Sequence, residues 1–283
     1  MKLCIQCPIN LLEKYAIFSD NIHVVYAEYI GYNRYTKFYH TRQKYYNDDI
    51  ILFDRSFSLS YNQLIQKAKK VSATHIVAPS YPFEYYNKTI NEVMNFISYL
   101  KQINQQHFKV CVIPQSNLDD IKGWIKSFKF FQNVDEIDMI MLYSKSVSAV
   151  FSFKTNDTEI EINRLYLTRF LKDKGEVFTK RIHYLGEGQR LHFISKYDYF
   201  CSIDVMSPVI DGIKGIKYDV NLGLPKDRIL YNNILEEFDD VNEDIVLWNL
   251  MCVRKWSNGN CPTNYTDFNI LRDQKVTTRR KIV

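Results

Sequence analysis

The sequence predicts an α/β protein whose fold is a (β/α)8 TIM-like barrel. Eight short apolar runs recur along the chain, and segments with apolar residues at helical spacing separate most of them. The runs are continuously apolar over most of their length and do not alternate regularly with polar residues, which is typical of parallel strands buried on both faces. Eight such runs within 283 residues fit a closed barrel better than an open doubly wound sheet, which remains the alternative fold.

The eight apolar runs are the expected strands. Their lengths of four to seven residues are typical of buried strands between turn signals. Because the last run stops at Asp204, we expect its strand to end there. In chain order the expected strands span residues 2–6, 23–29, 50–53, 75–78, 109–113, 138–143, 182–186 and 199–203.

Helices are expected wherever apolar residues recur every three to four positions. Asn117 is the expected N-cap of the third helix, because acidic residues follow it in the first turn. The stretch 31–49 is too polar and aromatic for a regular crossover helix. Residues 146–157 are expected to form an inserted ribbon over the barrel mouth, the end where the carboxyl ends of the strands meet, and residues 207–223 a glycine-rich loop. The expected helices span residues 61–71, 89–103, 117–131, 158–173, 226–238 and 241–255.

One domain is expected, because barrels of about 250 residues routinely form a single unit. Residues 1–225 would form the barrel with its small insertions, and residues 226–283 a C-terminal helical extension and basic tail of the same domain. No apolar run reaches the roughly 18 residues of a membrane span, and the start lacks the pattern of a signal peptide. We therefore expect a cytoplasmic protein without membrane contact.

The six cysteines do not indicate a metal site. Cys4 and Cys7 form a CxxC, but it lies inside the first apolar run and no second CxxC exists to complete a zinc site. Cys252 and Cys261 have no histidine after them at ligand spacing. We predict no zinc subdomain and no bound metal.

The charge balance permits a nucleic-acid partner without requiring one. The net charge is +5, and 21 tyrosines could stack on bases, although a solvated surface with a basic tail gives the same composition. Any DNA affinity should fall steeply with salt, because each phosphate contact releases counterions. Arg279, Arg280 and Lys281 in the tail would contribute affinity that does not depend on DNA sequence.

Candidate site residues follow from the expected barrel, in which catalytic groups lie at the carboxyl ends of the strands. The first polar residues after the runs are two carboxylates, an amide, hydroxyls and a glycine. Taken singly, each aspartate is as typical of a turn or a helix cap. The strand-end residues are Asp54, Ser80, Gln115, Tyr143, Ser144, Gly186 and Asp204.

Two carboxylates at one barrel mouth suit substitution at a sugar carbon. One carboxylate attacks the anomeric carbon and holds it covalently, while the other moves a proton on the leaving group. Gln115 offers both a donor and an acceptor to a flat ligand, and glycines at 186 and 188 leave room for it against the backbone. Asp54 and Asp204 together therefore favour glycosidic chemistry.

Five segments of the chain carry a further signal when they are taken in order: LFDRSF, VAPSYPFEYYNKT, VIPQSN, HYLGEG and CSIDVMSP. In order and spacing they resemble the tRNA-guanine transglycosylase superfamily, and in particular its phage and bacterial DNA 7-deazaguanine transglycosylases. The resemblance covers roughly residues 20 to 220, and its most specific elements are HYLGEG and, within the last segment, SID and SP. The composition, rich in lysine, asparagine and tyrosine, is typical of an AT-rich genome and compatible with a phage protein in the host cytoplasm or a bacterial one.

The resemblance implies a DNA guanine transglycosylase that exchanges guanine in DNA for a 7-deazaguanine. Asp204 matches the family's nucleophile, which attacks the sugar C1′, and Asp54 matches its general acid/base. No cofactor is implied, because the co-substrate is the free base, such as 7-cyano-7-deazaguanine. His183 lies in the same motif, where we expect it to pack beneath the base. The expected base-binding residues are Ser80, Glu84, Gln115, Tyr143, Gly186 and Glu187.

The chain departs from the family pattern at two points. Ser80 stands where the family has an aspartate that reads the purine edge, so it loses a bidentate acceptor, and Glu84 is the expected substitute. The zinc subdomain of the tRNA enzymes is absent, which favours DNA over tRNA; a duplex would have to release its guanine by base flipping. The alternatives are a catalytically degenerate barrel that binds nucleic acid or a partner subunit, and a nucleoside hydrolase-like enzyme. The sequence does not determine the oligomeric state.

Overall fold

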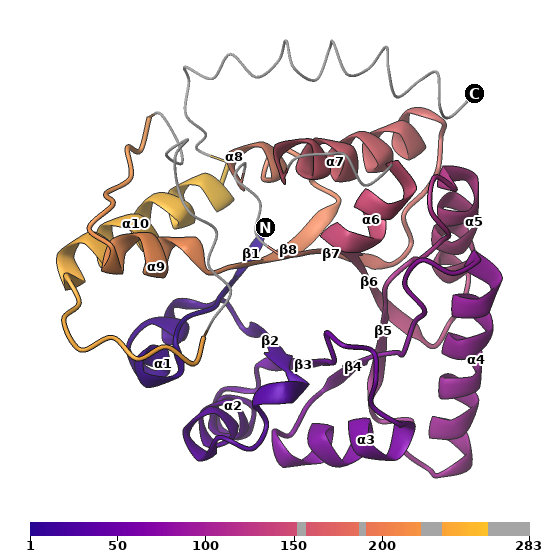
Figure 1. Ribbon diagram of the computed structural model, residues 1–283, viewed down its shortest axis with the longest axis horizontal. Coiled ribbons are helices and arrows are strands. Elements are labelled where there is room, and N and C mark those ends of the chain that lie inside the picture. Colours follow the sequence, from indigo (N-terminus) through magenta and orange to yellow (C-terminus); the bar gives the residue numbers. More distant parts are fainter. Residues whose placement is uncertain (152–156, 187–190, 222–233, 260–283) are drawn as a thin grey trace.

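The computed structural model describes residues 1–151, 157–186, 191–221 and 234–259. In this part of the chain, eight parallel strands form one sheet of order β1-β8-β7-β6-β5-β4-β3-β2, which curls into a nearly closed barrel (Figure 1). The predicted (β/α)8 TIM-like barrel is therefore confirmed over the open sheet. The strands are β1 Lys2–Ile5, β2 Ile22–Tyr26, β3 Asp49–Phe53, β4 His75–Val77, β5 Lys109–Val112, β6 Ile137–Tyr143, β7 Arg181–Leu185 and β8 Phe200–Val205.

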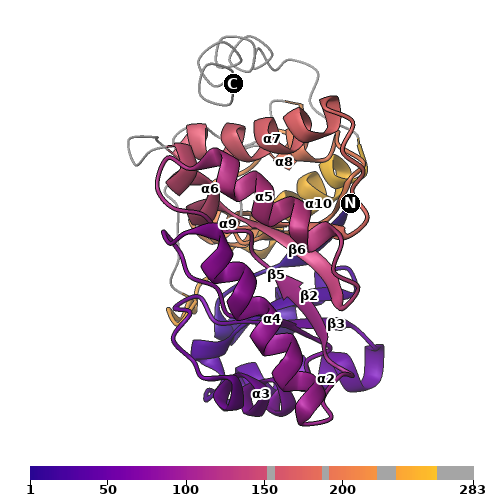
Figure 2. The same ribbon diagram turned by 90° about the vertical axis from the view of Figure 1, so that its right-hand side faces the viewer.

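Helices cover the outside of the barrel, as Figures 1 and 2 show. Their apolar faces pack on strands that are themselves buried along nearly their whole length. The helices are α1 Leu12–Tyr15, α2 Asn33–Tyr46, α3 Tyr61–Lys70, α4 Tyr86–Gln102, α5 Ile121–Gln132, α6 Ser144–Phe151, α7 Asp157–Asp173, α8 Leu191–Ile194, α9 Ser207–Ile213 and α10 Glu243–Ser257, with 3-10 turns η1 Ile9–Leu11, η2 Ala16–Phe18 and η3 Ala27–Tyr29.

Helix α2 occupies the segment that the sequence analysis rejected as a crossover helix, so that prediction is wrong. One face of α2 buries Tyr35, Phe38 and Tyr39, and the rings of Tyr35 and Tyr39 meet edge to face with centroids 4.8 Å apart. The Tyr35 hydroxyl accepts a hydrogen bond of 2.9 Å from the backbone N–H of Tyr26. Tyrosine thus acts here as a core residue with a polar end that is satisfied.

Four other expectations need correction. The described residues of the predicted ribbon include the end of helix α6, which buries Val147 and Val150 three positions apart. Helix α9 lies in the predicted glycine-rich loop and has Pro208 in its first turn, where proline is favoured.

The N-cap of helix α5 is Asp120 and not Asn117, because the Asp120 side chain accepts from the N–H of Gly123. Residues 234–238 of the helix predicted at 226–238 are not helical, and the rest of it lies outside the described residues.

Side chains bridge the seam between β1 and β2. Instead of a backbone ladder, the N–H of Val24 donates to Cys4 Sγ (3.2 Å), and Gln6 Nε2 donates to the carbonyl of Val24 (3.0 Å). Asp20 accepts from the N–H of Leu3 at 2.7 Å and also receives Arg254 of α10, whose Nη1 lies 2.7 and 2.6 Å from its two oxygens. The C-terminal helix therefore stabilises the seam of the barrel.

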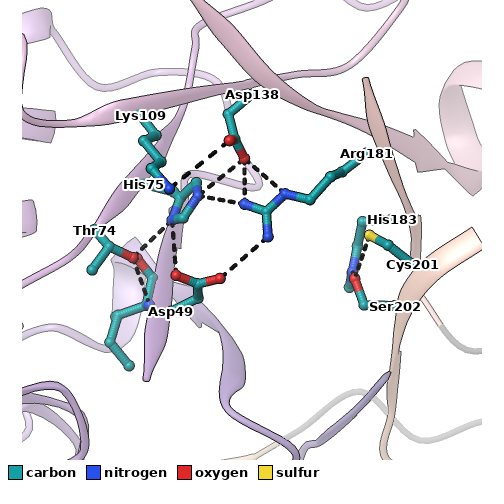
Figure 3. Close-up of polar contacts among 10 residues, drawn as sticks. Asp49, Thr74, His75, Lys109, Asp138, Arg181, His183, Cys201 and Ser202 are labelled. Atoms are coloured by element: carbon teal, nitrogen blue, oxygen red, sulfur yellow. Dashed lines mark hydrogen bonds and ion pairs between the residues drawn. The ribbon is translucent and has the colours of Figure 1, made fainter. Parts of the chain in front are cut away.

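A charged network lies at the opposite end from the mouth, where the strands begin. Arg181 donates to both Asp138 and Asp49, and His75 Nε2 lies 3.2 Å from Asp138 (Figure 3). Burial raises the pKa of Asp138, but hydrogen bonds from His75 and Arg181 and their charge outweigh burial and hold that pKa below its usual range. The network joins β3, β4, β6 and β7 across the amino end of the barrel.

Candidate active site at the carboxyl ends of the strands

The predicted site residues that the structure describes lie at one end of the barrel, with Glu84 in the turn that leads into α4. Because all eight strands are parallel, the residues that follow or end β3 to β8 share the mouth. Asp54 follows β3, Ser80 and Gln115 lie in the turns after β4 and β5, Tyr143 ends β6, Gly186 follows β7 and Asp204 lies in β8.

Asp204 does not end its strand, which corrects the sequence-based expectation. Strand β8 continues to Val205, and Asp204 pairs in register with Cys4 of β1. The carbonyl of Val205 accepts from the N–H of Gln6, so the ladder runs past the carboxylate. With only 3% of its surface exposed, Asp204 needs hydrogen bonds from inside the barrel.

The two oxygens of Asp204 have different surroundings. Oδ1 accepts a 2.6 Å hydrogen bond from the N–H of Gly186 and lies 3.2 Å from Nε2 of His183. Among the described residues, no hydrogen bond reaches Oδ2. The carboxylate is thus held by one oxygen while the other is left available, as an attacking nucleophile requires.

His183 connects Asp204 to Ser202. Nδ1 of the buried imidazole lies 2.8 Å from the Ser202 hydroxyl, and Nε2 lies 3.2 Å from Asp204 Oδ1. Figure 3 shows His183 beside Ser202. If Nε2 carries the hydrogen and the Ser202 hydroxyl donates to Nδ1, the neutral ring satisfies both neighbours. His183 therefore helps to orient the Asp204 carboxylate, whereas the sequence predicted only a packing role for it.

Hydrogen bonds hold both the N–H and the carbonyl of Gly186. Its φ of +82° lies in the left-handed region that favours glycine, and in this conformation its N–H points at Asp204. Its carbonyl accepts from Arg164 Nη1 at 3.3 Å, and the same nitrogen lies 2.8 Å from the carbonyl of Leu185. The backbone that orients Asp204 is thus itself fixed by a side chain of α7.

Arg164 was not singled out by the sequence analysis. Its guanidinium is 1% exposed, stacks 3.8 Å over the ring of Tyr184, and has no carboxylate partner among the described residues. Within the described part of the chain it donates to carbonyls at the ends of β6 and β7. The sequence did contain a signal for Arg164. It lies on the same helical face as Leu167 and Leu171, which are buried, and a charged side chain is seldom buried without a partner.

Ser80 and Gln115, the expected base-reading pair, contact each other. Gln115 Nε2 donates to the Ser80 hydroxyl at 3.2 Å, and the two side chains are 1% and 2% exposed. In this arrangement the amide nitrogen of Gln115 faces Ser80, and the Gln115 oxygen is the group available to a ligand.

Asp54 differs from Asp204 because both of its oxygens are occupied by its own loop. Oδ1 accepts from the N–H and the hydroxyl of Ser56 at 3.0 and 2.6 Å. Oδ2 accepts from the N–H groups of Ser58 and Leu59 at 2.8 and 2.9 Å. This arrangement is that of a turn-capping aspartate, the alternative that the sequence left open.

Tyr143 lies in the electrostatic field of Asp204 and near the Asp54 loop. Burial raises the pKa of the Tyr143 hydroxyl; the nearby Arg55 lowers it, and Asp204 raises it further. The ring of Tyr143 lies 5.7 and 6.4 Å from the rings of Phe53 and Phe57, centroid to centroid. Tyr143 therefore connects the surroundings of the two aspartates.

Of the remaining predicted site residues, the structure describes Glu84. Glu84 is half exposed and forms an ion pair of 3.1 Å with Lys88, one helical turn away. Glu187 and the tail residues Arg279, Arg280 and Lys281 lie outside the described residues.

Within the described residues, no group of three or more His, Cys, Asp or Glu side chains is arranged to hold a metal ion. Burial raises the pKa of both Cys4 and Cys7, so each is a protonated thiol rather than a reactive thiolate. None of the described helices combines the length and apolar character needed to cross a membrane.

Comparison with models of protein families and with curated proteins gives no match to this chain.

Proposed function

We propose that this protein is a DNA guanine transglycosylase that replaces guanine with a 7-deazaguanine through a covalent link to Asp204. The observation that carries the proposal is the asymmetry of the Asp204 carboxylate. Oδ1 receives Gly186 and His183, whereas Oδ2 has no hydrogen bond among the described residues. The order of motifs that resembles the transglycosylase family supports the same residue as nucleophile.

The reaction takes two substitutions at C1′ of a deoxyguanosine. Asp204 Oδ2 attacks C1′, the bond from C1′ to guanine N9 breaks, and guanine leaves after taking up a proton. The N9 of the incoming 7-deazaguanine then attacks C1′, loses its proton, and releases the Asp204 carboxylate. The N–H of Gly186 keeps Oδ1 in place throughout, so little reorganisation is needed.

The base would lie between the paired Ser80 and Gln115 and the ring of Tyr143. The Gln115 oxygen accepts from the amino or imino groups of a guanine edge, while the Ser80 hydroxyl is already oriented by Gln115. Free 7-deazaguanine would bind there in the second step, and DNA is the proposed partner. Proton transfer by Asp54 requires the release of at least one of its four donors, so Asp54 is the less supported half of the pair.

The test is nucleoside analysis of modified DNA. The protein is expressed together with a supply of 7-cyano-7-deazaguanine, and the DNA is digested and examined by mass spectrometry. We expect the 7-deazaguanine deoxynucleoside with the wild type and none with Asp204→Asn. Equal incorporation by both proteins would reject Asp204 as the nucleophile.

A barrel that binds nucleic acid or a partner subunit without catalysis is the second candidate. Two observations favour it. Both oxygens of Asp54 already accept hydrogen bonds from its own loop, and position 80 carries a serine, which has no carboxylate. This candidate predicts DNA binding without base exchange, even with purified protein and excess 7-deazaguanine.

A further inference from the structure

Three aromatic side chains are exposed on the turn between β4 and α4, immediately after Ser80. Tyr81, Phe83 and Tyr85 expose 37%, 41% and 64% of their surface. Aromatic rings in this chain otherwise supply much of the core, and three exposed rings within five residues form an apolar surface that a folded protein normally avoids. We call these three residues the aromatic turn.

A hydrogen bond from Tyr81 ties the aromatic turn to helix α4. The N–H of Tyr81 donates to the hydroxyl of Thr89, which is fully buried in α4, at 3.1 Å. Phe83 adopts a φ of +66°, a left-handed conformation that is rare for a bulky residue and costs free energy. The backbone of the turn is thus tied to α4 at Tyr81 and strained at Phe83.

Ammonium groups lie beside aromatic rings at this position. Lys88 Nζ lies 4.6 Å from the centre of the Tyr81 ring, and Lys126 Nζ of α5 lies 5.4 Å from that of Tyr86. Lys88 also pairs with Glu84, which leaves the local charge mixed and not strongly basic. A ring with an ammonium group beside it offers a surface for a base and a charge for a phosphate, the two groups that a single nucleic-acid strand presents.

We propose that the aromatic turn stacks on the unpaired bases that flank the target nucleotide of a single DNA strand. The inference rests on the proposed function, because the turn begins at Ser80 and leads away from the candidate base site. Stacking on a ring accepts every base, so this surface supplies affinity for unpaired DNA without reading its sequence. A base-paired duplex keeps its bases inside and gains little from it.

The experiment compares two double variants of the whole protein. Phe83→Gly/Tyr85→Leu removes two rings and relieves the left-handed strain at position 83. The matched control is Tyr45→Leu/Tyr46→Leu, since these tyrosines are 68% and 61% exposed at the end of α2, away from the mouth. Fluorescence anisotropy with a labelled single strand of about 12 nucleotides gives the dissociation constants. Thermal melting verifies that both variants fold.

We expect the aromatic-turn variant to bind the single strand at least about tenfold more weakly than the wild type, with the control within about twofold. Equal binding by all three proteins, or equal losses in the two variants, would overturn the proposal. Base exchange is measured separately. A wild type that needs the aromatic turn for binding but exchanges no base would reject the proposed function alone, whereas exchange with unchanged binding in the variant would reject the stacking surface alone.

Discussion

Asp54 and Asp204 are the same type of residue at the same end of the barrel, yet their hydrogen bonds give them different capacities. Asp204 has a bound oxygen and an available one, whereas Asp54 has four donors from three residues of its own loop. The difference arises from the backbone around each carboxylate rather than from its position after a strand.

Asp54→Asn should destabilise the protein. The amide nitrogen cannot accept, so either the two N–H groups of Ser58 and Leu59 or the two groups of Ser56 lose their acceptor. We expect a loss of about 1–3 kcal/mol in the free energy of unfolding, measured with urea. Ser56→Ala, which removes only one donor, should cost less. A variant as stable as the wild type but inactive would instead indicate a role for Asp54 in proton transfer.

Gly186→Ala should impair base exchange more than stability. Among the described residues, and leaving out the chain neighbours of Gly186, the added Cβ meets only the Ser144 hydroxyl at 4.0 Å. The expected cost is therefore the strain of an alanine at φ +82°, about 1 kcal/mol. A shift of the Gly186 N–H away from Asp204 loosens the oriented oxygen. Labelled-base incorporation and thermal melting separate the two effects. Gly175→Ala, also at φ +82° and with no neighbour of its Cβ, is the control that should lower only the melting temperature.

The positions of the site residues could be predicted, but their partners could not. Reading the first polar residue after each strand found Ser80, Gln115 and Gly186, because parallel strands end together. The contact of His183 with Ser202 depends on a shift in the register between β7 and β8, which lies between Ile182 and His183. No local sequence pattern predicts such a shift. The hydrogen bonds that Asp54 accepts from its own loop likewise depend on the backbone conformation of that loop.

At the scale of elements, the seam between β1 and β2 depends on α10. Arg254 meets both oxygens of Asp20, which in turn accepts from the N–H of Leu3, and it also donates to the carbonyl of Phe18. A helix predicted only as a C-terminal extension therefore holds the first strand of the barrel. Sequence patterns gave its approximate range but not this contact, because its partner lies 234 residues away.

Arg254→Ala should therefore weaken the barrel through Asp20. Both side chains are about one third exposed, so solvent screens the pair, and we expect a coupling energy of about 1 kcal/mol. A double-mutant cycle with Asp20→Asn, followed by urea unfolding, measures that coupling. Additive effects of the two substitutions would show that α10 does not stabilise the seam through this pair.

The elements that sequence analysis missed have a common cause. Helix α2 buries the rings of Tyr35 and Tyr39, and the Tyr35 hydroxyl accepts a hydrogen bond, so residues that count as polar in the sequence form part of its buried face. Helix α6 is short and directly follows β6, which made its residues resemble part of an extended ribbon. The eight strands were predicted correctly because they are continuously apolar and bounded by turn residues.

At the scale of the whole molecule, the two ends of the barrel have different roles. The charged network of Asp49, His75, Asp138 and Arg181 joins four strands at the amino end, while the candidate site lies at the carboxyl end. This division is typical of barrels, in which one end contributes stability and the other contributes chemistry.

The network should make stability depend on acid pH. The pKa of Asp138 is lowered in the folded state, so its contribution is present above the ordinary aspartate pKa of about 3.9 and is lost as the pH falls below it. We expect Asp138→Asn to cost about 2 kcal/mol at pH 7 and much less near pH 2. Urea unfolding across this range measures the difference, and a cost that does not change with pH would contradict the account.

The central claim is that Asp204 forms a covalent bond to DNA, and the most direct measurement is the adduct itself. Asp204→Asn retains an oxygen for the N–H of Gly186 and puts an amide nitrogen at the available Oδ2, so fold and DNA binding should survive. Wild-type protein incubated with guanine-containing DNA should give a complex that resists denaturation, with the DNA attached to Asp204 in peptide mapping, and Asp204→Asn should give none. An adduct that persists in Asp204→Asn, or that maps to Asp54, would contradict the account.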